Sequence, residues 1–393
     1  VLSLQSSDPV GLELPIPVAD AQAHSARVTA SVRKHIEKAG GALPFDRYMD
    51  LVLYAPGLGY YAAGARKFGP AGDFVTAPEL GPLFGRCLAR QLAEVLQRLG
   101  TGGVLEVGPG TGALAAVLLE ELAALDALPD QYALLEPSPD LKTRQQALLA
   151  GRLGDNVVRC NWVDDLPRDW TGVVLANEVV DALPVTRFRV HSGRPLHARV
   201  RHGEAGFEWS WEDPDDGGAE TSIIDRHQLS EGYTSERSPR AGAWVAEVAK
   251  RLRRGLLLII DYGYAAPEYY HSDRAAGTLR CHYRHRVHSD PFWYPGLQDI
   301  TAHVDFSALA EAGCAAGFEL AGFSSQEAFL LSLGLTDVAA VTDDLRSRID
   351  VSREIQQLAM ASGMGERFKA LALVKDMEGP LLGFQLRDRS GQL

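Results

Sequence analysis

Hydrophobic and polar residues follow two different periods along this chain, and the two periods alternate. Short apolar runs between glycine, proline or polar residues predict buried strands, and longer stretches with apolar residues three and four positions apart predict helices. Strands that alternate with helices pair in parallel and are covered on both faces, so the pattern predicts an α/β fold. The predicted strands are Val104–Val107, Tyr132–Leu135, Val157–Cys160, Val173–Ala176, Leu256–Ile260, Phe318–Phe323 and Phe368–Lys375.

The predicted helices lie before and between these strands. Five strands followed by two late ones form a layout that resembles the Rossmann-like seven-stranded sheet of the class I methyltransferases. The last strand alternates in the manner of an edge strand. The predicted helices are Ala23–Ala39, a helix with Phe45, Tyr48, Met49 and Val52 on one face, Leu83–Leu99, Ala113–Leu125, a helix that ends at Ala150, Pro239–Arg253, Phe306–Ala316 and Thr336–Ala361.

Three segments interrupt this alternation of strands and helices. Residues 54–85 are rich in glycine, proline and aromatic residues, and a long irregular stretch of this kind is typical of a lid or binding loop. Residues 186–213 alternate and carry turn signals, which predicts an antiparallel ribbon, and residues 261–305 are irregular. We therefore expect an N-terminal helical region with the lid (1–85), the first half of the core (86–185), the inserted ribbon (186–238), the fifth strand with its helix (239–262), a substrate-side loop insertion (263–305) and a C-terminal part that completes the sheet (306–393).

Composition and charge narrow the range of functions. The 393 residues are 46% hydrophobic and 23% charged, which is typical of a globular protein. The net charge of −12 disfavours a long nucleic-acid surface, because such surfaces are basic. The apolar runs are all much shorter than the roughly 18 residues that a membrane-spanning helix needs. Four widely spaced cysteines form no C-x-x-C pair, which fits a reducing compartment, and the start of the chain does not resemble a secretory signal.

A glycine-rich loop follows the first predicted strand. The sequence VLEVGPGTGAL places Gly108, Gly110 and Gly112 between a strand and a helix, where glycine lets a ligand approach the backbone closely. A dinucleotide fold needs G-x-G-x-x-G, and Ala113 stands where its third glycine would be. S-adenosylmethionine carries no phosphate and needs an anion near its positive charges, which Glu106 could supply. A tight turn without a ligand is the alternative.

Polar residues also follow the second and third predicted strands. Glu136 stands at the end of the second strand, where a carboxylate can accept both hydroxyl groups of a ribose. Asn161 and Trp162 follow the third strand and offer an amide and a flat ring for an adenine. Trp162 could equally belong to the core, and Glu136 could be an ordinary helix cap.

The fourth predicted strand leads into Asn177, Glu178 and Asp181, at the edge where open α/β sheets bind ligands. Paired carboxylates can hold a guanidinium group by bidentate hydrogen bonds. A capping cluster on the following turn is the alternative. The histidine-rich run 281–288 invites a metal interpretation, but its arginines would repel a dication, which favours a substrate-binding segment. Further polar residues that could complete an acceptor pocket are Gln298, Asp299, Thr301, His303 and Asp305.

Several stretches resemble the MidA-like methyltransferases, a family that includes the mitochondrial complex I assembly-factor arginine methyltransferase and its bacterial relatives. The most specific are GDFVTAPE, NEVVDALP and GLQDITAHVDF, and the similarity runs from Tyr48 to Phe306. The resemblance implies S-adenosylmethionine as cofactor and an arginine of a protein, in eukaryotic members a complex I subunit, as the methylated group. By similarity, the cofactor site includes Gly72 and Asp73 together with Glu106, Gly108, Gly110 and Glu136.

The chain is accordingly expected to be a protein arginine methyltransferase with catalytic residues Asn177, Glu178 and Asp181 and no metal. The composition looks bacterial, which predicts the cytoplasm; a eukaryotic chain would belong in the mitochondrial matrix. The edges of the ribbon suggest a homodimer contact. Two alternatives are a nicotinamide- or flavin-linked oxidoreductase and a non-catalytic assembly factor that keeps the cofactor fold.

Overall fold

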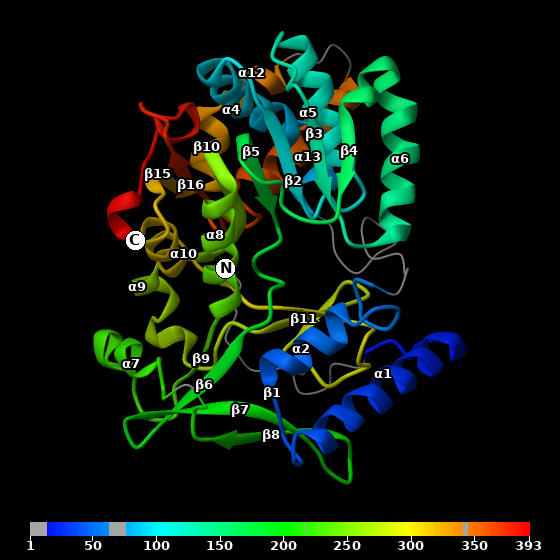
Figure 1. The fold of residues 1–393 in the computed structure, drawn as a ribbon, viewed down its shortest axis with the longest axis vertical. Coiled ribbons are helices and arrows are strands. Elements are labelled where there is room, and N and C mark those ends of the chain that lie inside the picture. The colour runs from blue at the N-terminus through cyan, green and yellow to red at the C-terminus, as the bar shows by residue number, and fades with distance from the viewer. Residues whose placement is uncertain (1–13, 63–75, 216, 341–344) are drawn as a thin grey trace. The chain divides into compact units, whose positions relative to one another are not determined.

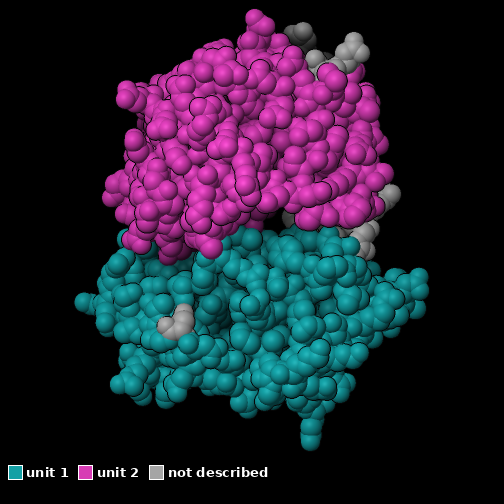
Figure 2. All heavy atoms as spheres, in the orientation of Figure 1, with its two compact units in different colours: residues 1–74, 182–240, 266–303 teal, residues 75–181, 241–265, 304–393 magenta. Residues whose placement is uncertain are grey.

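The computed structural model describes residues 14–62, 76–215, 217–340 and 345–393. The chain forms two compact units, each assembled from three separate segments (Figure 2). Residues far apart in the sequence therefore share one core. Unit 1 comprises residues 1–74, 182–240 and 266–303, and unit 2 comprises residues 75–181, 241–265 and 304–393.

Unit 2 is built on one large β-sheet (Figure 1). Within the described ranges its strands are β2 (Gly103–Val107), β3 (Tyr132–Leu135), β4 (Cys160–Val163), β5 (Trp170–Asn177), β10 (Leu252–Tyr264), β14 (Val304–Asp305), β15 (Glu319–Ser325) and β16 (Phe368–Lys375). Seven of them lie in the order β15-β16-β10-β5-β2-β3-β4, and β14 pairs with β10. The pairs from β10 to β4 are parallel, whereas β16 runs antiparallel to both of its neighbours. This arrangement confirms the predicted α/β class.

Two predictions about these strands are wrong. The third strand begins at Cys160 instead of Val157, because Gly154–Arg159 form a 3-10 helix, η1. The strand Phe368–Lys375 is not an edge strand, since it lies between β10 and β15 and its residues 369–374 are buried. The alternation in its sequence reflects small and large side chains within the core and not an exposed face.

Helices cover the sheet of unit 2 on both faces. They are α3 (Ala77–Leu80), α4 (Leu83–Leu99), α5 (Ala113–Ala124), α6 (Pro139–Leu153), α8 (Pro239–Arg251), α10 (Phe306–Ala315), α11 (Gln326–Ser332), α12 (Leu335–Ala339) and α13 (Leu345–Ala359), with η3 (Leu382–Phe384) and η4 (Ser390–Gln392) near the end. Helix α4 packs against α5, α12 and α13, and α10 packs against β10, β15 and β16. The predicted single helix 336–361 is described as two helices, α12 and α13, and residues 341–344 lie outside the described residues.

In the described part of unit 1, antiparallel strands form two sheets, and the long helices α1 and α2 are amphipathic. Its helices are α1 (Ala19–Lys38), α2 (Phe45–Tyr54), α7 (Thr221–His227), α9 (Ala266–Tyr269) and η2 (Ser272–Arg274). One sheet contains β1 (Leu43–Pro44), β6 (Thr186–His191), β7 (Arg194–His202), β8 (Phe207–Glu212) and β9 (Thr234–Arg237), and the other contains β11 (Arg280–Tyr283), β12 (Arg286–His288) and β13 (Asp299–Thr301). Helices α1 and α2 lie beside each other and against β7 (Figure 1). The predicted apolar face of α2 is confirmed, because its members are all buried: Phe45, Tyr48, Met49 and Val52.

The predicted antiparallel ribbon is confirmed as β6, β7 and β8. Ser192 and Gly193 turn the chain between β6 and β7 with φ values of 51° and 72°, as a two-residue hairpin with left-handed residues requires. Residues 263–305 are more regular than expected, since they include the sheet β12-β11-β13. The histidine-rich run forms the β11–β12 hairpin of that sheet, and its tip residues Arg284 and His285 have φ values of 47° and 61°.

Candidate active site

The glycine loop joins β2 to α5 in a left-handed conformation. Gly108, Gly110 and Gly112 have φ values of 63°, 56° and 85°, which L side chains rarely adopt. A Cβ atom on Gly108 would lie 3.0 Å from Val179 Cγ2, whereas a Cβ atom on Gly110 would meet no described atom within 4 Å. Open space therefore borders the backbone of Gly110, and a ligand could approach it there.

Glu106, two residues before this loop, is a buried acid. The residue is 3% exposed, and the hydroxyl group of Tyr132 on β3 donates a hydrogen bond of 2.5 Å to Glu106 Oε2. Burial raises the pKa of Glu106 to about 7; the hydrogen bond from Tyr132 opposes this shift, and the negative charge of Glu136 adds to it. A cation bound beside this carboxyl group would favour its ionised form. Its contact with the cofactor stays a prediction.

Glu136 follows β3 and is also buried, at 4% exposure. The backbone N–H of Ser138 donates to its Oε1 atom over 2.8 Å, and the side-chain amide of Gln145 donates to its Oε2 atom over 3.2 Å. Ser138 is itself the N-cap of α6. The carboxylate of Glu136 is therefore held in a fixed orientation after the second parallel strand, at the same sheet edge as the glycine loop.

Gln145 on α6 is a residue that the sequence analysis missed. Its Nε2 atom also donates to the carbonyl oxygen of Gly110 over 2.8 Å, and its Oε1 atom accepts the indole N–H of Trp162 over 2.8 Å. One buried amide thus connects three residues predicted for the cofactor site. A lone glutamine within an amphipathic helix carries no local signal, so only the fold could identify it.

The residues predicted after the third strand have different environments. Asn161 is exposed on the edge strand β4. Trp162 is half-buried and packs against the main core of unit 2, while its indole N–H is used by Gln145. Trp162 therefore packs in the core, as the alternative interpretation expected, and is also hydrogen-bonded to Gln145, which contacts Gly110 and Glu136.

Asn177 ends β5 beside β10, and Glu178 follows it. Glu178 has a left-handed φ of 53°, and its Oε1 atom accepts the backbone N–H of Ala77 over 3.1 Å and the side-chain amide of Asn177 over 3.3 Å. Burial raises the pKa of Glu178 to about 8, and the nearby Asp261 contributes to the rise. The Oδ1 atom of Asn177 is buried and has no hydrogen-bond donor among the described residues. Both side chains thus present acceptors that a cationic donor would satisfy.

Asp261 on β10 holds the turn that follows β5. It is fully buried, and its Oδ2 atom accepts the backbone N–H groups of Val179, Val180 and Asp181 at 3.1, 2.8 and 3.3 Å. Burial raises the pKa of Asp261 to about 6, although these hydrogen bonds act in the opposite direction. The cap of this turn is therefore Asp261, which comes from another strand and was not predicted. Glu178 instead accepts the N–H of Ala77, the first residue of α3, so the catalytic role of Glu178 and Asp181 stays a prediction.

Part of the predicted lid contacts both regions of the site. Helix α3 is joined to Glu178 through the N–H of Ala77, and Glu79 Oε1 accepts the hydroxyl group of Thr111 in the glycine loop over 2.5 Å. The next helix, α4, begins at Leu83, whose N–H is capped by Glu354 of α13 over 2.7 Å. Gly72 and Asp73, and the middle of the lid, lie outside the described residues.

The additional acceptor candidates belong to both units, four to unit 1 and Asp305 to unit 2. Asp299 Oδ1 accepts the hydroxyl group of Tyr61 over 2.8 Å within unit 1, and Gln298 donates to the carbonyl group of Trp293 over 2.6 Å. His303 and Thr301 also belong to unit 1. Asp305, in unit 2, caps α10 by accepting the N–H of Ala308 over 3.1 Å. Asp305 therefore has a structural role.

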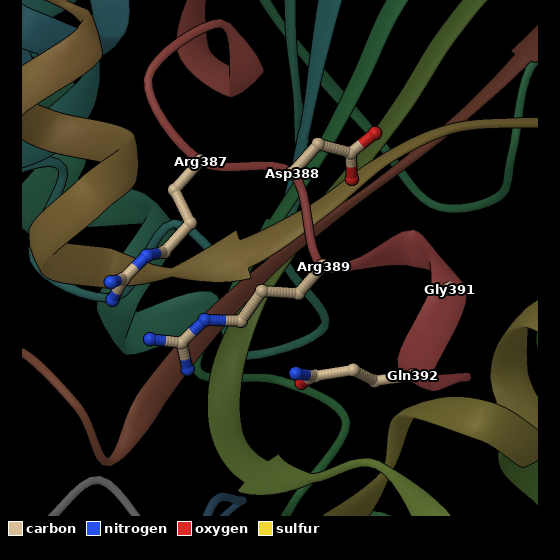
Figure 3. Close-up of a pocket in the computed structure, with 5 residues that line it drawn as sticks. All are labelled: Arg387, Asp388, Arg389, Gly391 and Gln392. Atoms are coloured by element: carbon tan, nitrogen blue, oxygen red, sulfur yellow. The ribbon is translucent and has the colours of Figure 1, made fainter.

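A shallow pocket of about 510 Å³ lies elsewhere in unit 2, at the C-terminal end of the chain (Figure 3). Its segment is attached to the edge strand β15, because Asp388 accepts the N–H of Phe323. Three strands separate β15 from β2, so this pocket is not part of the predicted site. It is lined by Arg387, Asp388, Arg389, Gly391 and Gln392.

Two negative findings concern metals and membranes. Within residues 14–62, 76–215, 217–340 and 345–393, no three histidine, cysteine, aspartate or glutamate side chains come together to hold a metal ion. In the same ranges, no helix combines the length and the apolar character needed to cross a membrane.

The sheet order, the open glycine loop after β2 and the buried acid after β3 fit S-adenosylmethionine and define an S-adenosylmethionine-dependent methyltransferase. A family model of S-adenosyl-L-methionine-dependent methyltransferases matches residues 87–324. The chain belongs to this family, the MidA-like methyltransferases.

Known relatives extend over almost the whole chain. A Burkholderia thailandensis chain, crystallised with S-adenosyl-homocysteine, is 45% identical and superposes with a TM-score of 0.94 over 97% of this chain and 100% of its own. The protein arginine methyltransferase NDUFAF7 homolog, mitochondrial, of Caenorhabditis elegans is 29% identical over 90% of this chain and 87% of its own length. The NDUFAF7 protein of Danio rerio is 27% identical, over 89% and 88%. The predicted family and cofactor are thereby confirmed, and the nicotinamide alternative is set aside.

Proposed function

We propose that this methyltransferase acts on an arginine of a protein substrate. The observation that carries the proposal is the pair of acceptors after β5, where Glu178 has a raised pKa and Asn177 Oδ1 is buried without a donor among the described residues. A guanidinium group is a planar cation with several N–H donors, so it complements both. The names of the relatives from Caenorhabditis elegans and Danio rerio, protein arginine methyltransferases, support the same substrate class.

The cofactor would be bound along the edge formed by the glycine loop and Glu136. We assign its binding to Glu106, Gly108, Gly110, Glu136 and Trp162. Bound S-adenosylmethionine supplies an electrophilic methyl group. The protein's contribution is to hold the acceptor nitrogen in line and to exclude water, because correct positioning can supply several kcal/mol of the barrier reduction, roughly 7–11 in the best oriented reactions. Gly72, Asp73 and Asn161 remain candidates of the same site.

Glu178 would change its protonation state when the acceptor binds. With a pKa of about 8 its carboxyl group holds a proton at neutral pH. A guanidinium cation lowers the pKa of a neighbouring carboxyl group, so Glu178 would release its proton to solvent and pair with the acceptor. Asn177 would accept one further N–H, and Asp181 would supply a second carboxylate. The acceptor nitrogen is then oriented, and the positive charge is localised away from it.

The substrate protein that we propose is a subunit of respiratory complex I or its bacterial counterpart, by analogy with the family. We further propose that the chain acts in the cytoplasm of a bacterium, or in the matrix if its source is a mitochondrion. The relatives from Caenorhabditis elegans and Danio rerio are named as mitochondrial proteins. A non-catalytic assembly role is the competing hypothesis, and detection of methyl transfer separates the two.

A methyl-transfer assay tests this function. Lysate of cells that lack the protein is incubated with purified enzyme and S-adenosylmethionine carrying a labelled methyl group, and the labelled band is analysed by mass spectrometry. We expect methylarginine in one band with the wild-type enzyme and at least tenfold less with Glu178→Gln and Asp181→Glu, while affinity for S-adenosyl-homocysteine is kept. Absence of any transfer favours the assembly role. A normal rate with Glu178→Gln would mean that the acceptor site lies elsewhere.

A further inference from the structure

Gln145 occupies an unusual position on α6. It is fully buried, and its side chain faces β3, β4 and the glycine loop through three hydrogen bonds. The partners are the Gly110 carbonyl group, the Glu136 carboxylate and the Trp162 indole N–H. Gly110 and Glu136 belong to the loops that follow β2 and β3, and Trp162 lies on β4. Gln145 is the shared partner that links all three.

The donors and acceptors of this network fix the orientation of the Gln145 side-chain amide. An indole N–H is a donor only, so the atom of Gln145 that faces Trp162 must be the amide oxygen. The amide nitrogen then faces Gly110 and Glu136, and each of its two N–H groups has one acceptor. A buried polar network whose members are satisfied is rigid, and a network with one missing member is costly. The backbone of Gly112 adds to the constraint, since a Cβ atom there would lie 3.2 Å from Gln145 Cγ.

We propose that Gln145 is a positioning residue for the nucleoside half of the cofactor. Through its three partners it fixes the distances between the loop backbone, the ribose-binding acid and the adenine-side ring before the cofactor binds. The proposal rests on the assignment of the cofactor site above and is independent of the arginine acceptor. Because these are the groups that Gln145 links among the described residues, its loss weakens binding of adenosine and of S-adenosyl-homocysteine by the same factor, whereas a purely structural glutamine affects folding alone.

The central variant is Gln145→Met, which keeps the length of the side chain and removes its amide. Affinity for S-adenosyl-homocysteine and for adenosine is measured by calorimetry, well below the unfolding temperature of each variant. We expect both affinities to fall by about 10–100-fold, the size of one or two lost hydrogen bonds. The matched control is Gln146→Met at the neighbouring exposed position, for which no change is expected.

A second variant, Trp162→Phe, keeps an aromatic ring and removes only the N–H donor. The two substitutions are then combined in one protein, which completes a double-mutant cycle. If Gln145 acts partly through Trp162, the fold-loss of affinity in the double variant is smaller than the two single fold-losses multiplied together. Independent losses in the cycle would overturn the coupling to Trp162. Wild-type affinities in a folded Gln145→Met protein would overturn the proposal itself. If that protein does not fold, Trp162→Phe decides alone: a several-fold loss supports the proposal and unchanged affinity refutes it.

The same measurements separate this proposal from the cofactor assignment. If the wild-type protein binds S-adenosyl-homocysteine and Glu136→Ala binds it equally well, the assigned site is wrong. If Glu136→Ala is weakened and Gln145→Met is not, the site is right and Gln145 is a structural residue of α6.

Discussion

Glu178 should make the protein less stable as the pH rises, and Glu178→Gln should remove this effect. The carboxyl group titrates near 4.5 in an ordinary environment and near 8 in the fold, because burial favours its neutral form. A raised pKa means that the folded state binds the proton more tightly than the unfolded chain does. The contribution to stability is therefore complete below pH 4.5 and is lost as the pH rises through about 8.

The magnitude follows from the two pKa values. At about 1.36 kcal/mol per pKa unit, the wild-type protein should lose at most about 4 kcal/mol relative to Glu178→Gln between pH 5 and pH 9, and less where water reaches this half-buried side chain. Glutamine resembles the neutral carboxyl group in shape, and its amide oxygen can still accept the N–H of Ala77. The two proteins should consequently be almost equally stable at pH 5, and the variant should be clearly more stable at pH 9.

Urea denaturation at pH 5, 7 and 9 measures this difference. Glu319→Gln provides the baseline, because that carboxyl group is exposed on β15. A stability difference between wild type and Glu178→Gln that is the same at all three pH values would refute the reasoning. Glu178→Gln is also expected to be defective in methyl transfer. Glu178 would then be a residue that the reaction needs and that lowers the stability of the folded protein at high pH.

Three further variants test other parts of the site. Asp261→Ala leaves the N–H groups that follow Glu178 without their acceptor, which costs about 1–3 kcal/mol for each buried group. We therefore expect the free energy of unfolding, measured by urea denaturation, to fall by about 3–5 kcal/mol. A fall below about 1 kcal/mol would contradict the capping role. Glu354→Ala removes the cap of α4 and should cost about 1–2 kcal/mol. Affinity for S-adenosyl-homocysteine should not change in that variant, and a tenfold drop in calorimetry would show that α4 shapes the cofactor site. Glu136→Ala should weaken the same affinity by about 10–100-fold, and unchanged binding would exclude Glu136 from the ribose site.

Local patterns were sufficient for the parts of the fold that depend on neighbours in the sequence. The bounds of β3, β16 and α4 were predicted to the residue, because a strand or helix period and its terminating residues are contained within the segment. The glycine loop was predicted for the same reason, since its left-handed residues must be glycines whatever lies around them. The central place of β16 was missed, because a buried alternating strand and an edge strand can have the same pattern.

The order of the sheet, the assembly of unit 1 from three segments and the residues that hold the site required the tertiary structure. Asp261 accepts hydrogen bonds from N–H groups that lie 80 to 82 positions earlier in the sequence. The three hydrogen-bond partners of Gln145 lie 9 to 35 positions away. A lone acid in a strand or a lone amide in a helix does not reveal such partners. The sequence by itself determined which residue types stand at the ends of the parallel strands. Only the folded chain decided which of them are buried, oriented and shifted in pKa, because burial and charge depend on contacts between segments that the sequence keeps apart.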